Sequence, residues 1–277
     1  YRVVVHRGAT WEPWSFDVSV VSGQRTALVP VLEEVIEIDG VLRMDPHSHG
    51  APSGDGRLSM EHRLLVHAAN GIQVHFGTDH DHVADYRPLL EPLGIARFMN
   101  SVLSNEVSPT LRGHHNVYPL EALPELPNHG STPWQQNLWS TEELHQNLRD
   151  RMGGGGIIQI NHGMSSSGMF RVARLSPETG VVGVPDHWSP DFDAMEVLND
   201  GSWTETTEVY LDLVSRGLVP TPVGVSDAHG YQAGEDFTYV YVGHDDPAAL
   251  TSDELLTAFM ARATVSTTGP YIEAMID

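Results

Sequence analysis

Cysteine and lysine are both absent from the 277-residue chain. Without cysteine there is no disulfide, no thiolate metal site and no cysteine nucleophile. All 15 basic residues are arginine, which excludes Schiff-base chemistry, a P-loop lysine and a carboxylated lysine that bridges metal ions. Histidine, by contrast, occurs 16 times. Because imidazole is the commonest neutral metal ligand and a proton carrier near neutral pH, we expect several histidines to serve a site.

Long apolar runs are also missing. No segment approaches the roughly 18 apolar residues of a membrane helix, so we expect no membrane span. The chain starts at Tyr1 and shows no signal peptide, so we expect a fragment or a processed form. The acidity and the lack of cysteine fit an extracytoplasmic bacterial protein, a salt-adapted one or a cytoplasmic one. They leave the compartment open.

Positive charge is scarce, with 37 acidic residues against 15 basic ones and a formal charge of −22. Such a surface repels phosphate backbones, so we expect no nucleic-acid partner. It is compatible with a site that attracts cations, although most of these charges are explained by solubility. The length and the 40% of apolar residues suit one large α/β domain plus a small extra piece.

The first 40 residues differ from the rest. They are rich in valine, threonine and aromatic residues with alternation, which predicts strands at 1–6, 15–21 and 26–38. Three short strands cannot form a stable domain alone. We therefore interpret residues 1–40 as the end of an accessory β domain that begins upstream, and residues 41–277 as the main domain.

From residue 41 onward, apolar strands alternate with helices, which predicts a parallel sheet or barrel. Strands are expected at 41–44, 72–76, 94–104, 157–160, 194–198 and 222–225, and helices at 59–70, 141–152, 204–216 and 251–263.

Polar clusters follow these strands, where parallel α/β folds and barrels bind their ligands. His47 and His49 are spaced i, i+2, so both imidazoles can meet one cation. Glu106 is the candidate for a carboxylate that bridges two cations. The other clusters are Thr78-Asp79-His80, Gly113-His114-His115, Asn161-His162 and Asp227-Ala228-His229.

The motifs of two other classes of hydrolase do not fit the sequence. The H-x-H-x-D-H motif of metallo-β-lactamases, aligned on Asp79 and His80, needs histidines at 75 and 77, and position 77 is glycine. No G-x-S-x-G elbow is present.

In order, the motifs D-x-H-x-H, T-D-H, E, G-H, N-H and D-x-H resemble those of the PHP superfamily, the polymerase and histidinol phosphatase domains. The resemblance covers residues 41–277. Within it the chain is similar to the carbaryl-hydrolase-like branch (the CehA/McbA type), through Gly113-His114-His115-Asn116 and the closing Thr267-Thr268-Gly269-Pro270. The resemblance implies a distorted (β/α)7 barrel with a metal cluster at its C-terminal mouth.

Carried over by position, the resemblance implies metal ligands at His47, His49, His80, Glu106, His114, His162, Asp227 and His229. Asp55 stands where family members place a further ligand, often histidine. His115 replaces a common aromatic residue and is interpreted as substrate-facing or structural. Glu196 and Asn199 are expected to support the site from behind the ligands.

One ion needs about four ligands, and this set is larger, so two or three divalent ions are expected. Zinc, manganese and iron all suit a mixture of imidazole and carboxylate ligands. We expect a phosphoesterase that acts on a small phosphate ester, with a hydroxide bridging two ions as nucleophile. Asp79 and His115 are candidates for the proton donor, and Arg112 for an anion clamp. The alternatives are a carboxylic or carbamic ester hydrolase with the same cluster, and a non-catalytic metal-stabilised binding domain.

Overall fold

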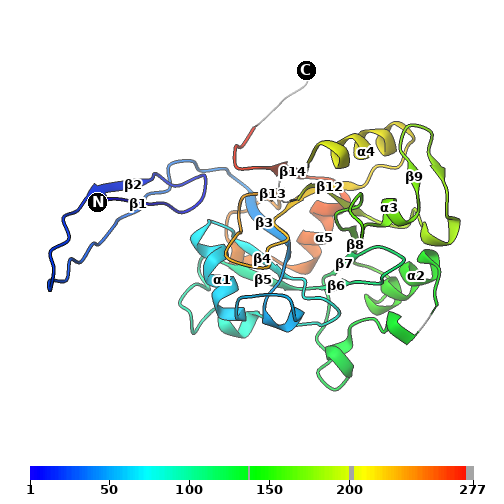
Figure 1. The fold of residues 1–277 in the computed structure, drawn as a ribbon, viewed down its shortest axis with the longest axis horizontal. Helices are drawn as coiled ribbons and strands as arrows, with labels where there is room; N and C mark the ends of the chain where they lie inside the picture. The colour runs from blue at the N-terminus through cyan, green and yellow to red at the C-terminus, as the bar shows by residue number, and fades with distance from the viewer. Residues whose placement is uncertain (137, 200–202, 273–277) are drawn as a thin grey trace.

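The computed structural model describes residues 1–136, 138–199 and 203–272, which form an α/β body with an N-terminal arm (Figure 1). In the arm, β1 (Arg2–Val5) pairs antiparallel with β2 (Trp14–Asp17). The strand expected at 26–38 is wrong, because this segment forms a single bridge, from Glu34 to Trp11, and is otherwise irregular. Its valines lie largely exposed without a covering strand in the described residues, so alternation alone did not produce pairing. The assignment of residues 1–40 to an accessory β domain stays a prediction.

The first sheet of the body has the strand order β14-β13-β3-β4-β5. Its parallel part consists of β3 (Val41–Ser48), β4 (Val74–Gly77) and β5 (Asn100–Leu103), while β13 (Phe237–Tyr241) and β14 (Thr264–Thr267) add an antiparallel pair. Helix α1 (Met60–Ala69) joins β3 to β4; Ser59 caps its start, and Gly71 beyond its end has a φ of 79°.

The second sheet has the order β12-β11-β8-β7-β6. Strands β8 (Ile157–Ile160), β11 (Ala194–Asn199) and β12 (Thr221–Val225) are parallel, and β7 (His115–Tyr118) runs antiparallel between β8 and β6 (Asn105–Val107). The connections contain α2 (Thr141–Arg151), α3 (Met169–Val172), the short pair β9 (Leu175–Ser176) and β10 (Val181–Val182), and α4 (Trp203–Ser215).

The expected α/β class is confirmed, but the closed barrel is not, because hydrogen bonding in the described residues divides the strands between two sheets. The sheets nevertheless adjoin at both edges. Ser104 alone separates β5 from β6 along the chain. At the other edge the Thr238 hydroxyl accepts from the N–H of Gly224 on β12 at 2.9 Å and donates to its carbonyl at 2.8 Å. The antiparallel pairs were missed for two reasons. Strands β6 and β7 turn back without a helix between them and give no alternating strand–helix signal, whereas β13 and β14 flank a helix at 252–260, as parallel strands would.

An apolar core locks the two sheets together. Phe76 of β4, Tyr118 of β7 and Val225 of β12 belong to one buried cluster, which α5 (Ser252–Met260) covers with Leu255 and Phe259. The parallel strands are thereby fixed with their carboxyl ends along one rim. None of the helices in the described part of the chain has the length and apolar character that a bilayer crossing requires.

The start of α5 offers a test of local stability. Thr251 and Glu254 form a reciprocal capping box, in which Glu254 N donates to the Thr251 hydroxyl at 3.2 Å and Thr251 N donates to the Glu254 carboxylate at 2.9 Å. Thr251→Ala should lower the free energy of unfolding by about 1 kcal/mol, while Thr251→Ser should retain it. Urea unfolding followed by circular dichroism measures both; equal losses would show that the hydroxyl is not the stabilising group.

Candidate metal centre

The rim of the body brings all nine expected ligands together. His47 lies within β3 and Glu106 within β6, while the other seven follow a strand or directly precede one. Three overlapping groups have ligand atoms within 4.8 Å of one another: His47, His49 and Glu106; His80, Glu106 and His114; and His49, Asp55, His80 and His229. His162 and Asp227 join them through Glu106 and His47, respectively.

The innermost group surrounds His47 and His49. Their Nε2 atoms lie 3.0 Å apart, and each lies close to Asp227 Oδ1, at 3.2 and 3.1 Å. Glu106 approaches both rings at 3.5 Å. Five polar atoms therefore converge on one largely buried point: the two imidazole nitrogens, Asp227 Oδ1 and both carboxylate oxygens of Glu106.

The protonation of these rings can be read from their outward-facing nitrogens. His47 Nδ1 lies 2.6 Å from the Glu196 carboxylate, so this nitrogen carries the proton. His49 Nδ1 lies 2.9 Å from the Ser53 hydroxyl, which itself donates to Asp55 and so has to accept from His49. When each ring is neutral, its Nε2 presents a lone pair to the other and to Asp227. Lone pairs and a carboxylate at these distances repel unless a cation lies between them.

The outer group repeats this arrangement. His229 Nδ1 faces the carbonyl of Asp227 at 2.8 Å, and His80 Nδ1 faces the Ser108 hydroxyl at 2.6 Å. Their Nε2 atoms lie 3.2 and 3.3 Å from Asp55 Oδ2. Asp55 therefore lies within reach of the same ion as His80 and His229, and its role as a ligand in place of the more common histidine stays a prediction.

Glu106 sits between the groups. Its carboxylate is fully buried, and Oε1 accepts from Asn161 at 2.9 Å and lies 3.1 Å from His114 Nδ1. Oε2 receives no hydrogen bond from a described residue, even though His80 Nδ1 is only 2.7 Å away. A buried carboxylate oxygen without a donor is costly. A divalent cation fits this oxygen and the converging imidazoles.

Electrostatics favours positive charge at the same point. Burial opposes protonation of His47, but Asp227, Glu196 and Glu106 outweigh it and raise the pKa of His47 well above its usual range. Burial would raise the pKa of Glu106, but His47 above all holds it well below its usual range. Without a metal ion, protonation of His47 supplies the positive charge that the surrounding carboxylates require.

Glu196 and its neighbours hold the ligands from behind, as expected. Besides His47, the Glu196 carboxylate accepts from the N–H of His162 at 2.6 Å and from the side chains of Asn199 and Gln159 at 2.7 and 3.2 Å. A carboxylate saturated in this way orients His47 and the His162 loop. Ser53 and Ser108, which fix two of the rings, were missed, because single serines in loops carry no sequence signal.

The three expected catalytic side chains lie outside the nine-residue group. Asp79 is buried and accepts from the N–H of Gly50 at 2.7 Å and the hydroxyl of Tyr86 at 2.9 Å, and burial raises its pKa to about 6. His115 is buried with Nε2 on the carbonyl of Arg112 at 3.1 Å. Their assignments as proton donors remain predictions.

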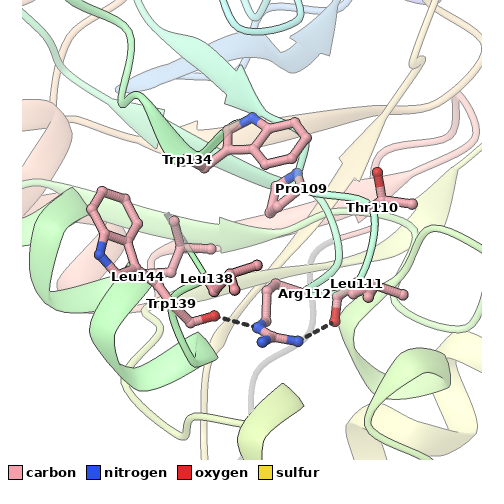
Figure 2. Close-up of a pocket in the computed structure, with 8 residues that line it drawn as sticks. All are labelled: Pro109, Thr110, Leu111, Arg112, Trp134, Leu138, Trp139 and Leu144. Carbon is pink, nitrogen blue, oxygen red and sulfur yellow. Dashed lines mark hydrogen bonds between the residues drawn. The ribbon is translucent and has the colours of Figure 1, made fainter. Parts of the chain in front are cut away.

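Arg112 lines a separate apolar cavity of about 140 Å³, shown in Figure 2. Its guanidinium donates to the carbonyls of Trp139, at 2.5 Å, and Leu111, at 3.2 Å. The other lining residues are Pro109, Thr110, Trp134, Leu138 and Leu144. Four of its lining residues, 109–112, belong to the segment between Glu106 and His114, but none of the nine side chains lines the cavity.

No known protein family matches the sequence, and the curated proteins contain no detectable match. Solved structures share the fold. A two-domain protein from Bacteroides vulgatus ATCC 8482, described as containing a predicted PHP-like metal-dependent phosphoesterase, has a TM-score of 0.57 at 18% identity, over 90% of this chain and 70% of that chain. PsfC from Pseudomonas syringae PB-5123 has a TM-score of 0.54 at 16% identity, over 82% of this chain and 91% of that chain. At these identities the likeness shows the fold alone.

The raised pKa of His47 makes metal binding depend on pH. In the metal-free fold the neighbouring carboxylates raise the pKa of His47 and favour its protonated form, and a metal ligand has to lose that proton. Affinity for Zn²⁺ should therefore fall as the pH is lowered from 8 to 6, by about tenfold per pH unit for each displaced proton. Calorimetry at pH 7 in buffers of different ionisation enthalpy should detect released protons. Equal affinity at both pH values, with no proton release, would contradict this.

Proposed function

We propose that the chain is a metal-dependent hydrolase that holds two or three divalent ions among the nine side chains. The observation that carries the proposal is the set of four imidazoles, His47, His49, His80 and His229, whose outward nitrogens are each engaged and whose Nε2 atoms face carboxylates. Zinc, manganese and iron suit such a mixed set. The fold shared with a structure described as PHP-like supports the proposal.

The leading candidate reaction is hydrolysis of a small phosphate ester. Bound ions would supply a water nucleophile that is active near neutral pH and a Lewis acid for the ester oxygen. The chain's own residues fix the donors: Glu196 and Ser53 set the tautomers of His47 and His49, and Glu106 links the ligand groups. The kinship with the carbaryl-hydrolase-like branch also belongs to this proposal and rests on the motifs alone.

A second candidate is a carboxylic or carbamic ester hydrolase with the same cluster. In the described ranges, no arginine pairs with any of the nine side chains, and an ester without a phosphate dianion needs no such clamp. Rates with an aryl phosphate, a diaryl phosphate, an aryl acetate and an aryl carbamate separate the two. Activity on the phosphates alone excludes the second candidate, and activity on the other esters alone excludes the first.

Removal of a central ligand tests the proposal. Glu106→Gln and His47→Ala should each lower kcat/KM by more than about 100-fold. Replacing a residue that only orients a ligand typically costs about 10- to 100-fold, and loss of a ligand itself should cost more. His62→Ala is the matched control: His62 is exposed on α1 and outside the nine-residue group, so it should retain wild-type activity. Wild-type activity in Glu106→Gln would contradict the placing of Glu106 at the centre of the site. A metal-loaded wild type that is inactive on every ester would favour the non-catalytic binding domain.

The apolar cavity beside Arg112 is suited to the alcohol part of the ester. Leu111 and Leu138 are 61% and 100% exposed, so their replacement should not disturb folding. Leu111→Ser/Leu138→Ser should raise KM for aryl esters about tenfold, corresponding to about 1.4 kcal/mol of lost apolar contact, with kcat nearly unchanged. Leu211→Ser, 59% exposed on α4, is the control. The same KM in both variants would exclude the cavity as a substrate site.

A further inference from the structure

Helix α1 places two buried basic side chains, Arg63 and His67, beneath the metal centre. They are spaced i, i+4 and so lie on one face of the helix. Arg63 is among the largest fully buried side chains of the described chain. A buried guanidinium is costly unless it is paired and hydrogen-bonded, so the partners of these two residues show what the helix does.

Arg63 donates to the two chain segments that carry inner and outer ligands. Its Nε donates to the carbonyl of His49 at 2.8 Å, and its Nη2 donates to the carbonyl of Ala228 at 2.6 Å. His49 follows β3, and Ala228 lies between Asp227 and His229 after β12. The planar guanidinium fork therefore fixes the distance between two ligand segments that belong to different sheets.

Asp45 forms the second link between the same segments. Its carboxylate accepts from the N–H of Ser226 at 3.0 Å and from the Ser226 hydroxyl at 2.5 Å. His67 Nε2 lies 2.9 Å from Asp45 Oδ2, the oxygen that also accepts from the Ser226 hydroxyl, while His67 Nδ1 faces the carbonyl of Arg63 at 3.0 Å. Both nitrogens of His67 therefore face oxygen atoms, one on Asp45 and one on the backbone of α1.

Few backbone hydrogen bonds join the ligand segment after β3 to the one after β12. The hydrogen-bonded ladders end within each sheet, and beyond them a single bridge, Ser48 to Ala228, pairs the described ends of β3 and β12. Two backbone bonds accompany it, from Asp227 N to His47 O at 2.9 Å and from His49 N to Ala228 O at 3.1 Å. Metal ligands need placement to within about 0.5 Å, and the side chains from α1 supply the remaining restraints.

We propose that Arg63, His67, Asp45 and Ser226 form a brace that positions the ligands of β3 against those of β12. The inference rests on the proposed metal binding and assigns these four residues as positioning residues, which touch neither the ions nor the substrate. The brace couples the register of two sheets to the geometry of His47, His49, Asp227 and His229.

Two conservative variants test the brace. Ser226→Ala removes one hydroxyl, and Asp45→Asn keeps the shape of the side chain while removing its charge. Ser101→Ala is the matched control: the Ser101 hydroxyl is also bonded to a buried histidine, His75 at 3.0 Å, whose ring packs against that of His67 but whose side chain forms no hydrogen bond to the brace. Each protein is titrated with Zn²⁺ against a competing chelator, and zinc content is measured at limiting metal.

The brace predicts that Ser226→Ala and Asp45→Asn bind the weakest-held ion about 10- to 100-fold less tightly and lose about one zinc per chain at limiting metal, with cooperative melting retained. Ser101→Ala should bind as the wild type does, and Ser226→Thr, which restores the hydroxyl, should recover binding. Wild-type affinity in Ser226→Ala, which removes the mildest contact and is expected to fold, would overturn the brace alone. An equal loss in Ser101→Ala would also overturn it. A wild type that binds no Zn²⁺ would contradict the proposed function, and the brace with it.

Discussion

The structure depends on one electrostatic constraint: buried carboxylates and imidazole lone pairs converge where water cannot compensate them. Glu106 has an oxygen without a donor, and the Nε2 atoms of His47 and His49 lie 3.0 Å apart beside Asp227. Such an arrangement is stable only with positive charge at its centre. The chain has no lysine to provide it, and its arginines stay outside the nine-residue group in the described residues. Protons or metal ions must therefore supply it.

The fold serves this constraint by bringing the ends of two sheets to one rim. Parallel strands deliver His47, His80, His162 and Asp227 at their carboxyl ends, and the antiparallel pair of β6 and β7 delivers Glu106 and His114. Around them lies a layer of hydrogen-bond partners, including Glu196, Ser53 and Ser108, which set the ring tautomers. Ligand identity alone would leave the rings free to rotate; these partners turn a cluster of histidines into a preorganised site.

The sequence could predict the ligands better than the fold around them. Motifs beside apolar strands, together with the resemblance to the PHP superfamily that alone named Asp55, gave the nine side chains that the structure brings together, because parallel strands end at one rim whatever the closure of the sheet. It could not predict that β7 and β13 run antiparallel, since the partners that fix their direction, β8 for β7 and β3 for β13, lie far away in the sequence. It also gave no functional signal for His67 or Arg63, because a buried basic residue on a helix cannot be told from a solvent-facing one until its partners are known. Arg112 is the opposite case: it lies beside a motif in the sequence, but its guanidinium donates to the backbone carbonyls of Trp139 and Leu111.

The most direct test of the central claim is a crystal structure of the metal-loaded protein with anomalous diffraction data at the absorption edge of the bound metal. The account predicts two or three anomalous peaks inside the nine-residue group, one between His47, His49 and Asp227, at about 2.0–2.2 Å from the ligand atoms. An absence of peaks there after incubation with zinc, manganese or iron, or peaks only at surface carboxylates, would contradict it.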